Sequence, residues 1–242
     1  MGAFPLVLRA PAAVRACRGV SSPAAKRHVA LRAIVVCSLC MGSWLCAACG
    51  YPESTVRDLR YEGVVAQTTE YSCGAAALAS LIALYFGIAA TEGDVLVQAE
   101  LVIRMRGSEP ASLIGLTALD LRNASAAFGL RLVGYELARE QLEGYFVEGG
   151  FPVVAHVREP RPHYVIIAGM ADAHFLICDP GWGRHVAHTS ELHGSRRASG
   201  VYLVAYPTEA QAAHAAEAQA QALEWMNARM HQLRIMRESV RL

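Results

Sequence analysis

Cys73 is the residue of this sequence whose type and position best suit nucleophilic chemistry. It lies in the stretch QTTEYSCGAAALAS, residues 67–80, directly before an alanine-rich apolar run. A helix that begins at Cys73 would hold the thiol at its N-terminus, where backbone N–H groups and the helix dipole stabilise a thiolate. Gly74 and the alanines after it would allow a substrate backbone to come close. For Cys73 taken alone, the alternative is an inert cysteine packed in the core.

His163 and Asp179 are the candidate base and the candidate group that orients it, both of which a thiolate nucleophile needs. His163 opens the apolar run HYVIIAGM, and Asp179 ends the next run, HFLICD, after the short connection ADA. If the two runs are antiparallel strands, the start of the first lies beside the end of the second. The spacing therefore predicts His163 and Asp179 at one edge of a sheet. For Asp179 the alternative is a turn former before proline.

Gln67 lies six residues before Cys73 and is a candidate donor to the oxyanion that forms when a thiolate attacks a carbonyl. Its amide would act together with the backbone N–H of Cys73. The alternative is a glutamine that only stabilises a turn. Trp182, in DPGWGR, either anchors a loop or lines the substrate cleft, and Cys178 is expected to be a core residue of its strand.

The remaining histidines do not predict a metal site. His185, His188 and His193 are separated by two and four residues, a spacing that matches no strong ligand pattern. We expect these residues, like His156 and His174, to be solvated loop histidines. The sequence predicts neither a metal nor another cofactor.

Residues 1–49 have the order of an export signal. Six Lys or Arg and no acid fall in the first 50 residues, and an uncharged apolar run spans residues 33–48. A basic flank, an apolar run and small residues follow one another in this order in secretory signals. LCAAC, residues 45–49, resembles a bacterial lipoprotein signal, although its leucine stands four residues before the last cysteine instead of three. We therefore expect a signal peptide or membrane anchor over 1–49, and an exported remainder, periplasmic or held at the membrane facing outward.

The rest of the chain is mildly acidic and poor in cysteine. Residues 51–242 contain sixteen Arg, no Lys and 21 Asp or Glu. This balance argues against a nucleic-acid partner, because phosphate binding requires a basic face. Five of the seven cysteines fall in the first 49 residues, and only Cys73 and Cys178 follow. Two cysteines form neither a disulfide framework nor a structural zinc site.

The apolar pattern predicts an α+β fold in which helices come first and antiparallel strands follow. An extended segment is expected over 50–66. Helices are expected over 73–86, 91–102, 112–128 and 138–150, and strands over 130–137, 151–157, 163–170, 174–180 and 200–207. The helices would pack on the sheet that positions the candidate site residues. These elements predict one domain over residues 50–206, which carries the candidate catalytic residues.

Residues 207–242 predict one long amphipathic helix, because they are rich in Ala and Gln and contain no Gly and no Pro after Pro207. An apolar stripe runs along it at steps of three and four: Leu223, Met226, Met230, Leu233, Met236 and Val240. The helix either packs on the surface of its own domain or docks to a partner, as in a coiled coil.

Taken together, these motifs resemble the C39-type cysteine peptidases, a papain-like family. The resemblance rests on Gln67 six residues before Cys73-Gly74, on His163 at the start of an apolar strand, and on Asp179-Pro180, and it covers residues 62–206. It implies that Cys73 is the nucleophile, His163 the base, Asp179 the orienting residue and Gln67 the oxyanion donor. Members of the family remove leader peptides that end in a double glycine from exported peptides.

The chain departs from the best-known members, which are fused to a membrane exporter and an ATPase. It has no further apolar run long enough to cross a membrane and no Walker A glycine loop, which is typical of a stand-alone exported form. The double-glycine substrate is tied to the cytoplasmic side, whereas this domain is expected to face outward. Similar stand-alone domains accompany secretion systems, including those for functional amyloid.

Two hypotheses of different classes follow from the sequence. In the first, the protein is a cysteine peptidase that cleaves a leader or an exported protein through a thioester. In the second, it is a catalytically silent module that binds a leader or client in the same cleft. Transfer or deamidation by the same residues is a third possibility. In each case, if the C-terminal helix docks to a partner, we expect a transporter or a secretion-system protein there. Only the N-terminal segment is expected to meet the membrane.

Overall fold

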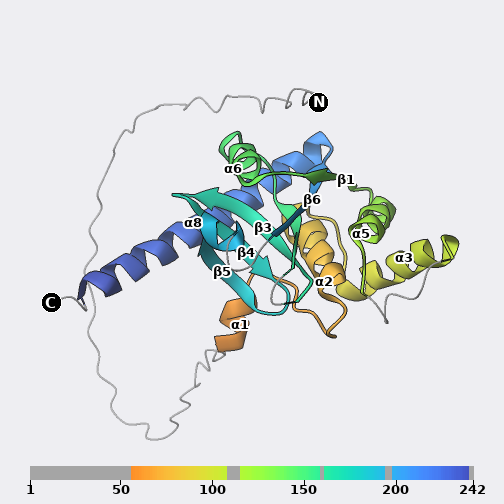
Figure 1. Ribbon diagram of the computed structural model, residues 1–242, viewed down its shortest axis with the longest axis horizontal. Helices are drawn as coiled ribbons and strands as arrows, with labels where there is room; N and C mark the ends of the chain where they lie inside the picture. The colour runs from red at the N-terminus through yellow and green to blue at the C-terminus, as the bar shows by residue number, and fades with distance from the viewer. Residues whose placement is uncertain (1–55, 108–114, 159–160, 194–197, 240–242) are drawn as a thin grey trace, which may run out of the picture. The chain divides into compact units, whose positions relative to one another are not determined.

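A six-stranded antiparallel sheet is the frame on which the candidate site residues are held (Figure 1). The computed structural model describes residues 56–107, 115–158, 161–193 and 198–239. The signal or anchor predicted over 1–49, including its lipoprotein-like sequence, lies outside these residues. Within the described ranges, no helix has the length and apolar character needed to cross a bilayer.

The strands follow one another across the sheet in the order β1-β6-β2-β3-β4-β5, with every neighbouring pair antiparallel. Their bounds are β1 Arg131–Glu136, β2 Val153–Val157, β3 His163–Ala171, β4 His174–Asp179, β5 Gly183–His188 and β6 Ala198–Tyr206. β3 and β4 form a hairpin whose two turn residues, Asp172 and Ala173, both have positive φ, 46° and 58°. Such turns match the twist of the paired strands and hold their register.

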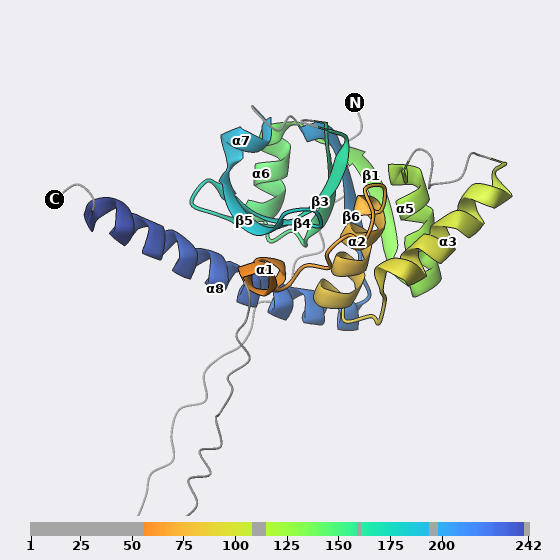
Figure 2. The ribbon, with the colours of Figure 1, turned by 90° about the horizontal axis from the view of Figure 1, so that it is seen from below.

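Helices cover both faces of the sheet (Figure 2). On one face lie α2 Cys73–Ser80, the π-helix η1 Leu81–Tyr85, α3 Glu92–Met105, α5 Ala118–Ser125 with the 3₁₀ turn η2 Ala126–Phe128, and α8 Glu209–Ser239. On the other lie α6 Arg139–Val147 and α7 Thr189–His193. The short helix α1 Val56–Tyr61 buries no residue and lies beside β5.

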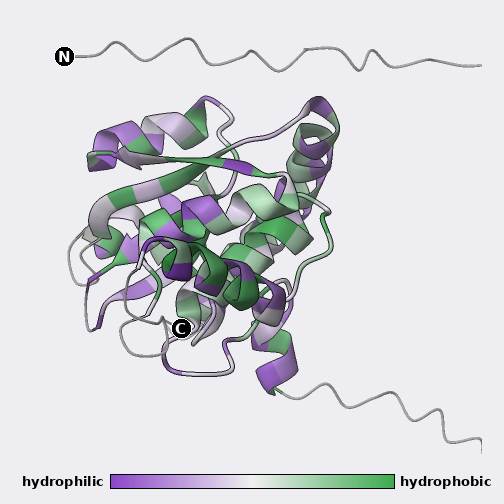
Figure 3. Ribbon diagram, turned by 90° about the vertical axis from the view of Figure 1, so that its right-hand side faces the viewer, coloured by the Kyte–Doolittle hydropathy of each residue, from purple (hydrophilic) through white to green (hydrophobic). Residues whose placement is uncertain are grey.

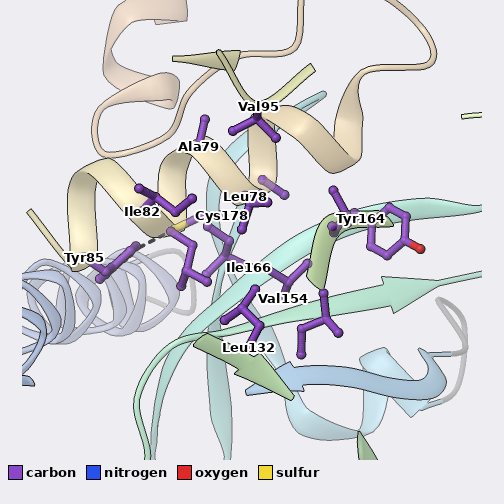
Figure 4. Packing of buried hydrophobic residues seen from close by; sticks show 14 of the residues in the cluster. Leu78, Ala79, Ile82, Tyr85, Val95, Leu132, Val154, Tyr164, Ile166 and Cys178 are labelled. Carbon is purple, nitrogen blue, oxygen red and sulfur yellow. Dashed lines mark hydrogen bonds between the residues drawn. The ribbon is translucent and has the colours of Figure 1, made fainter. Parts of the chain in front are cut away.

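Alternation along the strands divides the core between these two faces. Ile166 and Cys178 pack among the helices of the α2 side, whereas their neighbours Ile167 and Ile177 pack toward α6. Figure 4 shows the α2 side, where Ile82 points toward the sheet. In Figure 3 the central helices are largely hydrophobic and the outer helix ends hydrophilic. Since α2 is buried along its whole length, the position of Cys73 is fixed by the core.

The predicted α+β architecture is confirmed, and three local expectations are corrected. The segment 50–66 is not extended throughout, because 56–61 forms α1. The stretch around His185 and His188 is not a loop but the edge strand β5, in which Gly183 and Ala187 are buried and the other residues half-buried, and His156 and His174 lie on β2 and β4 instead of in loops. The third helix is shorter than 112–128, and its described part begins after Thr117, which forms a capping box with Asp120.

The long C-terminal helix packs on its own domain only in part. Ala215, Ala222 and Met226 of α8 are buried against the core. Farther along, Leu233 and Met236 are 43% and 61% exposed. The predicted stripe is therefore buried up to its middle and uncovered toward its end.

Candidate active site

Cys73 is the first residue of α2, as the sequence predicts, and is 9% exposed. Burial raises the pKa of its thiol, but several hydrogen bonds act in the opposite direction. They come from the His163 side chain and from the backbones of Tyr164 and Gly74, and the positive charge of His163 adds to them. The net result is a pKa below the ordinary value of a cysteine. The surroundings of Cys73 at the N-terminus of α2 therefore favour the thiolate form of its side chain.

His163 begins β3 and Asp179 ends β4, so the hairpin brings them to one edge of the sheet. The ring atom Nε2 of His163 lies 2.8 Å from Oδ1 of Asp179. Burial lowers the pKa of His163, but the hydrogen bonds and negative charges of Asp179 and Cys73 raise it to about 9. With Nε2 facing Asp179, the other ring nitrogen, Nδ1, is the one available to Cys73.

Asp179 also organises the turn that follows β4. Its Oδ1 accepts hydrogen bonds from the backbone N–H of Gly181, at 2.8 Å, and of Trp182, at 3.1 Å. Burial raises the pKa of Asp179, but the bond from His163, the charge of His163 and the Gly181 N–H lower it below its ordinary value. The carboxylate is therefore ionised and has a fixed orientation.

Gln67 lies next to this turn, because its backbone N–H donates to the Pro180 carbonyl at 3.0 Å. Its side-chain Nε2 donates to the Thr69 carbonyl at 2.8 Å. Its Oε1 is buried, and no hydrogen-bond partner for it exists among the described residues. A Cβ added at Gly181 would lie 3.2 Å from this Oε1 and 3.6 Å from the His163 ring. Gln67 is thus at the site, and its role as oxyanion donor stays a prediction.

Tyr164 is a site residue that the sequence analysis did not single out. Its ring lies 3.2 Å from where a Cβ of Gly74 would be, so the position after the nucleophile has little room for a side chain. On the other side, the ring of His156 is 4.9 Å from that of Tyr164. The sequence signal that could have found Tyr164 is its place directly after His163 in a strand that faces α2.

Cys178 is a core residue, as predicted, and contrasts with Cys73. It is fully buried, its Sγ lies 3.4 Å from the Tyr85 hydroxyl, and burial raises its pKa to about 11 (Figure 4). Both cysteines are free thiols. Trp182 is 57% exposed on the turn after Asp179.

Two of the histidines considered as metal ligands, His174 and His188, lie on neighbouring strands. The rings of His174 and His188 meet edge to face across β4 and β5, with centroids 5.0 Å apart. Over the part of the chain that the structure describes, no group of three or more His, Cys, Asp or Glu side chains could hold a metal ion.

A buried thiol at a helix N-terminus, an imidazole bonded to it and a carboxylate on the other ring nitrogen form the arrangement that cysteine hydrolases use. The model of the peptidase C39 family matches residues 62–209. The chain belongs to the peptidase C39 family.

Among curated proteins, the chain is similar to the probable functional amyloid protease FapD of Pseudomonas aeruginosa, with 26% identity over 129 residues. The match covers 53% of this chain and 54% of that protein, so it spans about half of the relative's length.

Two solved structures are also similar. A double-glycine motif protease from an AMS/PCAT transporter, crystallised with a leader peptide, is 27% identical with a TM-score of 0.49, over 60% of this chain and 91% of that one. The peptidase domain of Streptococcus ComA is 21% identical with a TM-score of 0.49, over 60% and 98%.

Proposed function

We propose that the protein is a cysteine peptidase that cleaves a peptide bond of an exported polypeptide through a thioester on Cys73. The observation that carries the proposal is the opposed titration of two adjacent groups. The pKa of Cys73 is lowered and that of His163 is raised to about 9, each partly by the other. A lowered cysteine pKa beside a raised histidine pKa favours the thiolate–imidazolium form of the pair, which is the reactive form of a cysteine nucleophile.

The proposed reaction has two stages. The Cys73 thiolate adds to the carbonyl carbon, and the resulting oxyanion accepts hydrogen bonds from the Cys73 backbone N–H and the Gln67 amide. The His163 imidazolium donates its proton to the leaving nitrogen, and the C–N bond breaks to give a thioester and a free amine. Water then gives a proton to His163 and adds to the thioester. The acid product leaves, and Cys73 returns to the thiolate.

Asp179 and Gln67 have supporting roles in this scheme. Asp179 keeps Nε2 of His163 occupied, so that Nδ1 faces the sulfur throughout the reaction. Gln67 donates one Nε2 hydrogen to Thr69 in the free protein. A carboxamide nitrogen carries two hydrogens, and the second is the one proposed to meet the oxyanion.

Two observations support an exported polypeptide as the substrate. The family consists of peptidases, and the curated relative is named as a functional amyloid protease. The N-terminal segment has the composition of an export signal. We therefore propose that the domain acts outside the cytoplasm, with a secreted chain or its leader as substrate. A fusion of residues 1–55 to alkaline phosphatase tests the location, because this reporter is active only after export.

The end of α8 is the proposed docking element for a transporter or secretion-system protein. Leu233 and Met236, three residues apart on one face of the helix, are both more than 40% exposed there, and an uncovered apolar helix face is a common partner surface.

The first experiment is alkylation of Cys73 by iodoacetamide as a function of pH, on the full chain, with each cysteine followed by peptide mass spectrometry. Cys178, whose thiol is buried, is the internal control. We expect rapid labelling of Cys73 at pH 6 that is lost in His163→Ala. Labelling that follows an ordinary thiol, with pKa about 8.5, and is unchanged in His163→Ala, would contradict the peptidase and favour the silent binding module.

A further inference from the structure

The helix α1 contacts the turn that carries the orienting carboxylate. Nε and Nη2 of Arg60 both donate to the carbonyl oxygen of Trp182, at 3.0 and 2.7 Å. The guanidinium carbon also lies 4.0 Å from the centroid of the Trp182 ring. Arg60 therefore holds Trp182 by two hydrogen bonds and by a cation–π contact.

The backbone of Arg60 fits against the next residue of the same turn. Gly183 has φ +92°, and a Cβ added there would lie 2.4 Å from the Arg60 carbonyl oxygen. Only glycine accommodates both the backbone conformation and this close approach. α1 and the turn are therefore packed backbone to backbone at Gly183.

An ion pair also ties the same segment to β5. Nη2 of Arg184 lies 2.9 Å from a carboxylate oxygen of Glu62. The side chain of Arg184 is only 9% exposed, and its guanidinium lies 3.9 Å from the ring of Trp225 on α8. Because Arg184 is fixed by its burial, Glu62 holds the end of α1 in place beside the turn.

A short chain of bonds leads from Arg60 to the candidate base. The carbonyl of Trp182 accepts from Arg60, and the N–H of Trp182 donates to Oδ1 of Asp179. The same Oδ1 binds Nε2 of His163 at 2.8 Å. A shift of Trp182 would therefore move or rotate the carboxylate that sets the orientation and proton affinity of His163.

We propose that Arg60 is a positioning residue for the Cys73–His163 pair, acting through Trp182 and Asp179. The proposal rests on the proposed function of that site, but its test is separate. Arg60 lies before the stretch that the family model matches, residues 62–209. The positioning device is thus supplied by the segment that leads into the peptidase domain, and the site depends on it.

The test measures the pKa of His163 in the full chain by NMR, from the ring Cε1–H signal of ¹³C-labelled histidine, assigned with His163→Gln. Arg60→Met keeps the length of the side chain and removes both donors, and Arg60→Lys keeps the charge without the two-donor fork. Arg57→Met is the matched control, because Arg57 is an exposed arginine one turn earlier on α1. Thermal unfolding identifies any variant that does not fold.

We expect a His163 pKa of about 9 in the parent chain. In Arg60→Met we expect a loss of about tenfold in proton affinity, which corresponds to one pKa unit. Arg60→Lys should show a smaller loss and Arg57→Met none. Other charged and titratable groups lie around the Cys73–His163 pair and the turn after Asp179, namely His156, Glu62, Arg184 and His185. The three variants leave these groups unchanged.

The outcomes separate the two proposals. An unchanged pKa of His163 in folded Arg60→Met and Arg60→Lys, or an equal fall of this pKa in Arg57→Met, would show that the positioning role of Arg60 is wrong. Either result would leave the peptidase proposal untouched. If the pKa falls as expected but Cys73 shows ordinary thiol reactivity in the parent chain, Arg60 positions the carboxylate and the peptidase proposal fails. A parent His163 with an ordinary pKa contradicts both.

Discussion

Replacing Asp179 with asparagine removes the negative charge that faces His163 and keeps an oxygen of similar shape. The asparagine Oδ1 can still accept from Nε2 of His163 and from the backbone N–H groups of Gly181 and Trp182, which Asp179 Oδ1 binds now. Asparagine also favours the same kind of turn. The substitution therefore isolates the charge from the geometry.

The magnitude follows from the balance of effects on His163. Its pKa is raised from 6.5 to about 9 although burial opposes the rise. Asp179 raises it through a hydrogen bond and through its charge, and Cys73 does the same on the other side. Asparagine at position 179 weakens the hydrogen bond to His163 and abolishes the effect of the negative charge. We expect a fall of about one pKa unit, equivalent to about 1.4 kcal/mol, to a value of about 8.

The measurement is the alkaline limb of the pH profile of peptide cleavage, together with the NMR titration of His163. The imidazolium must donate a proton to the leaving group, so activity falls as His163 loses its proton. The limb should move from about 9 to about 8 in Asp179→Asn. At pH 6 His163 is protonated in both proteins, so alkylation of Cys73 should not decrease.

Asp172→Asn is the matched control, because Asp172 is exposed at the far end of the same hairpin and asparagine tolerates its positive φ. It should leave both titrations unchanged. An alkaline limb that stays at about 9 in Asp179→Asn would refute the assignment of Asp179 as the charge that sets the His163 pKa.

Three further predictions concern stability, each measured by urea unfolding. Gly183→Ala should lower the free energy of unfolding by about 2–4 kcal/mol, because φ is +92° and a Cβ would lie 2.4 Å from a carbonyl oxygen. Gly149 has φ +84° but open space around it, so Gly149→Ala should lower it by about 1 kcal/mol. Tyr202→Phe should be neutral or stabilise the fold by up to about 1 kcal/mol, since no described residue forms a hydrogen bond with the buried Tyr202 hydroxyl. Tyr145→Phe should destabilise it by about 1 kcal/mol, because it removes the 3.0 Å hydrogen bond to the Phe151 carbonyl. Cys73→Ser should lose about 1–2 kcal/mol of its free energy of unfolding as the pH rises from 6.5 through the pKa of its His163. Asp179 still raises that pKa, but it lies below the parent value of about 9, because Cys73 contributes to the parent value. The parent chain should lose less, because the lowered pKa of its cysteine adds stability as the pH rises over the same interval. Equal stabilities within either matched pair, or a flat Cys73→Ser profile, would contradict the respective reasoning.

The positions of Cys73, His163 and Asp179 could be predicted because local sequence determines them. The apolar run after Cys73 has the length and composition of a buried helix, and the structure begins α2 at that residue. The two apolar runs before and after residues 171–173 have too short a connection for anything but a hairpin, and hairpin geometry alone brings His163 and Asp179 together. Periodicity and turn length were sufficient for this part of the site.

The edge strand β5 was missed because its sequence lacks the apolar alternation that marks a strand. GRHVAH contains two histidines and an arginine, and only its first and fifth residues are buried. An edge strand needs few apolar residues, because it has a neighbouring strand on one side only and few of its side chains are buried by the rest of the protein. Its formation depends on β4, which supplies the hydrogen bonds. Composition therefore favoured a solvated loop where tertiary pairing makes a strand.

The contact between Arg60 and the Trp182 carbonyl shows what sequence reasoning could not supply. The two residues are 122 positions apart, and the acceptor is a backbone carbonyl, a group that every residue possesses. No side-chain type at position 182 is needed to accept the bond, and no pattern around Arg60 marks it, since α1 buries none of its residues. Sequence identifies groups that do chemistry, because few residue types can do it. The groups that position them can be almost any residue, and are found only where the fold brings them together.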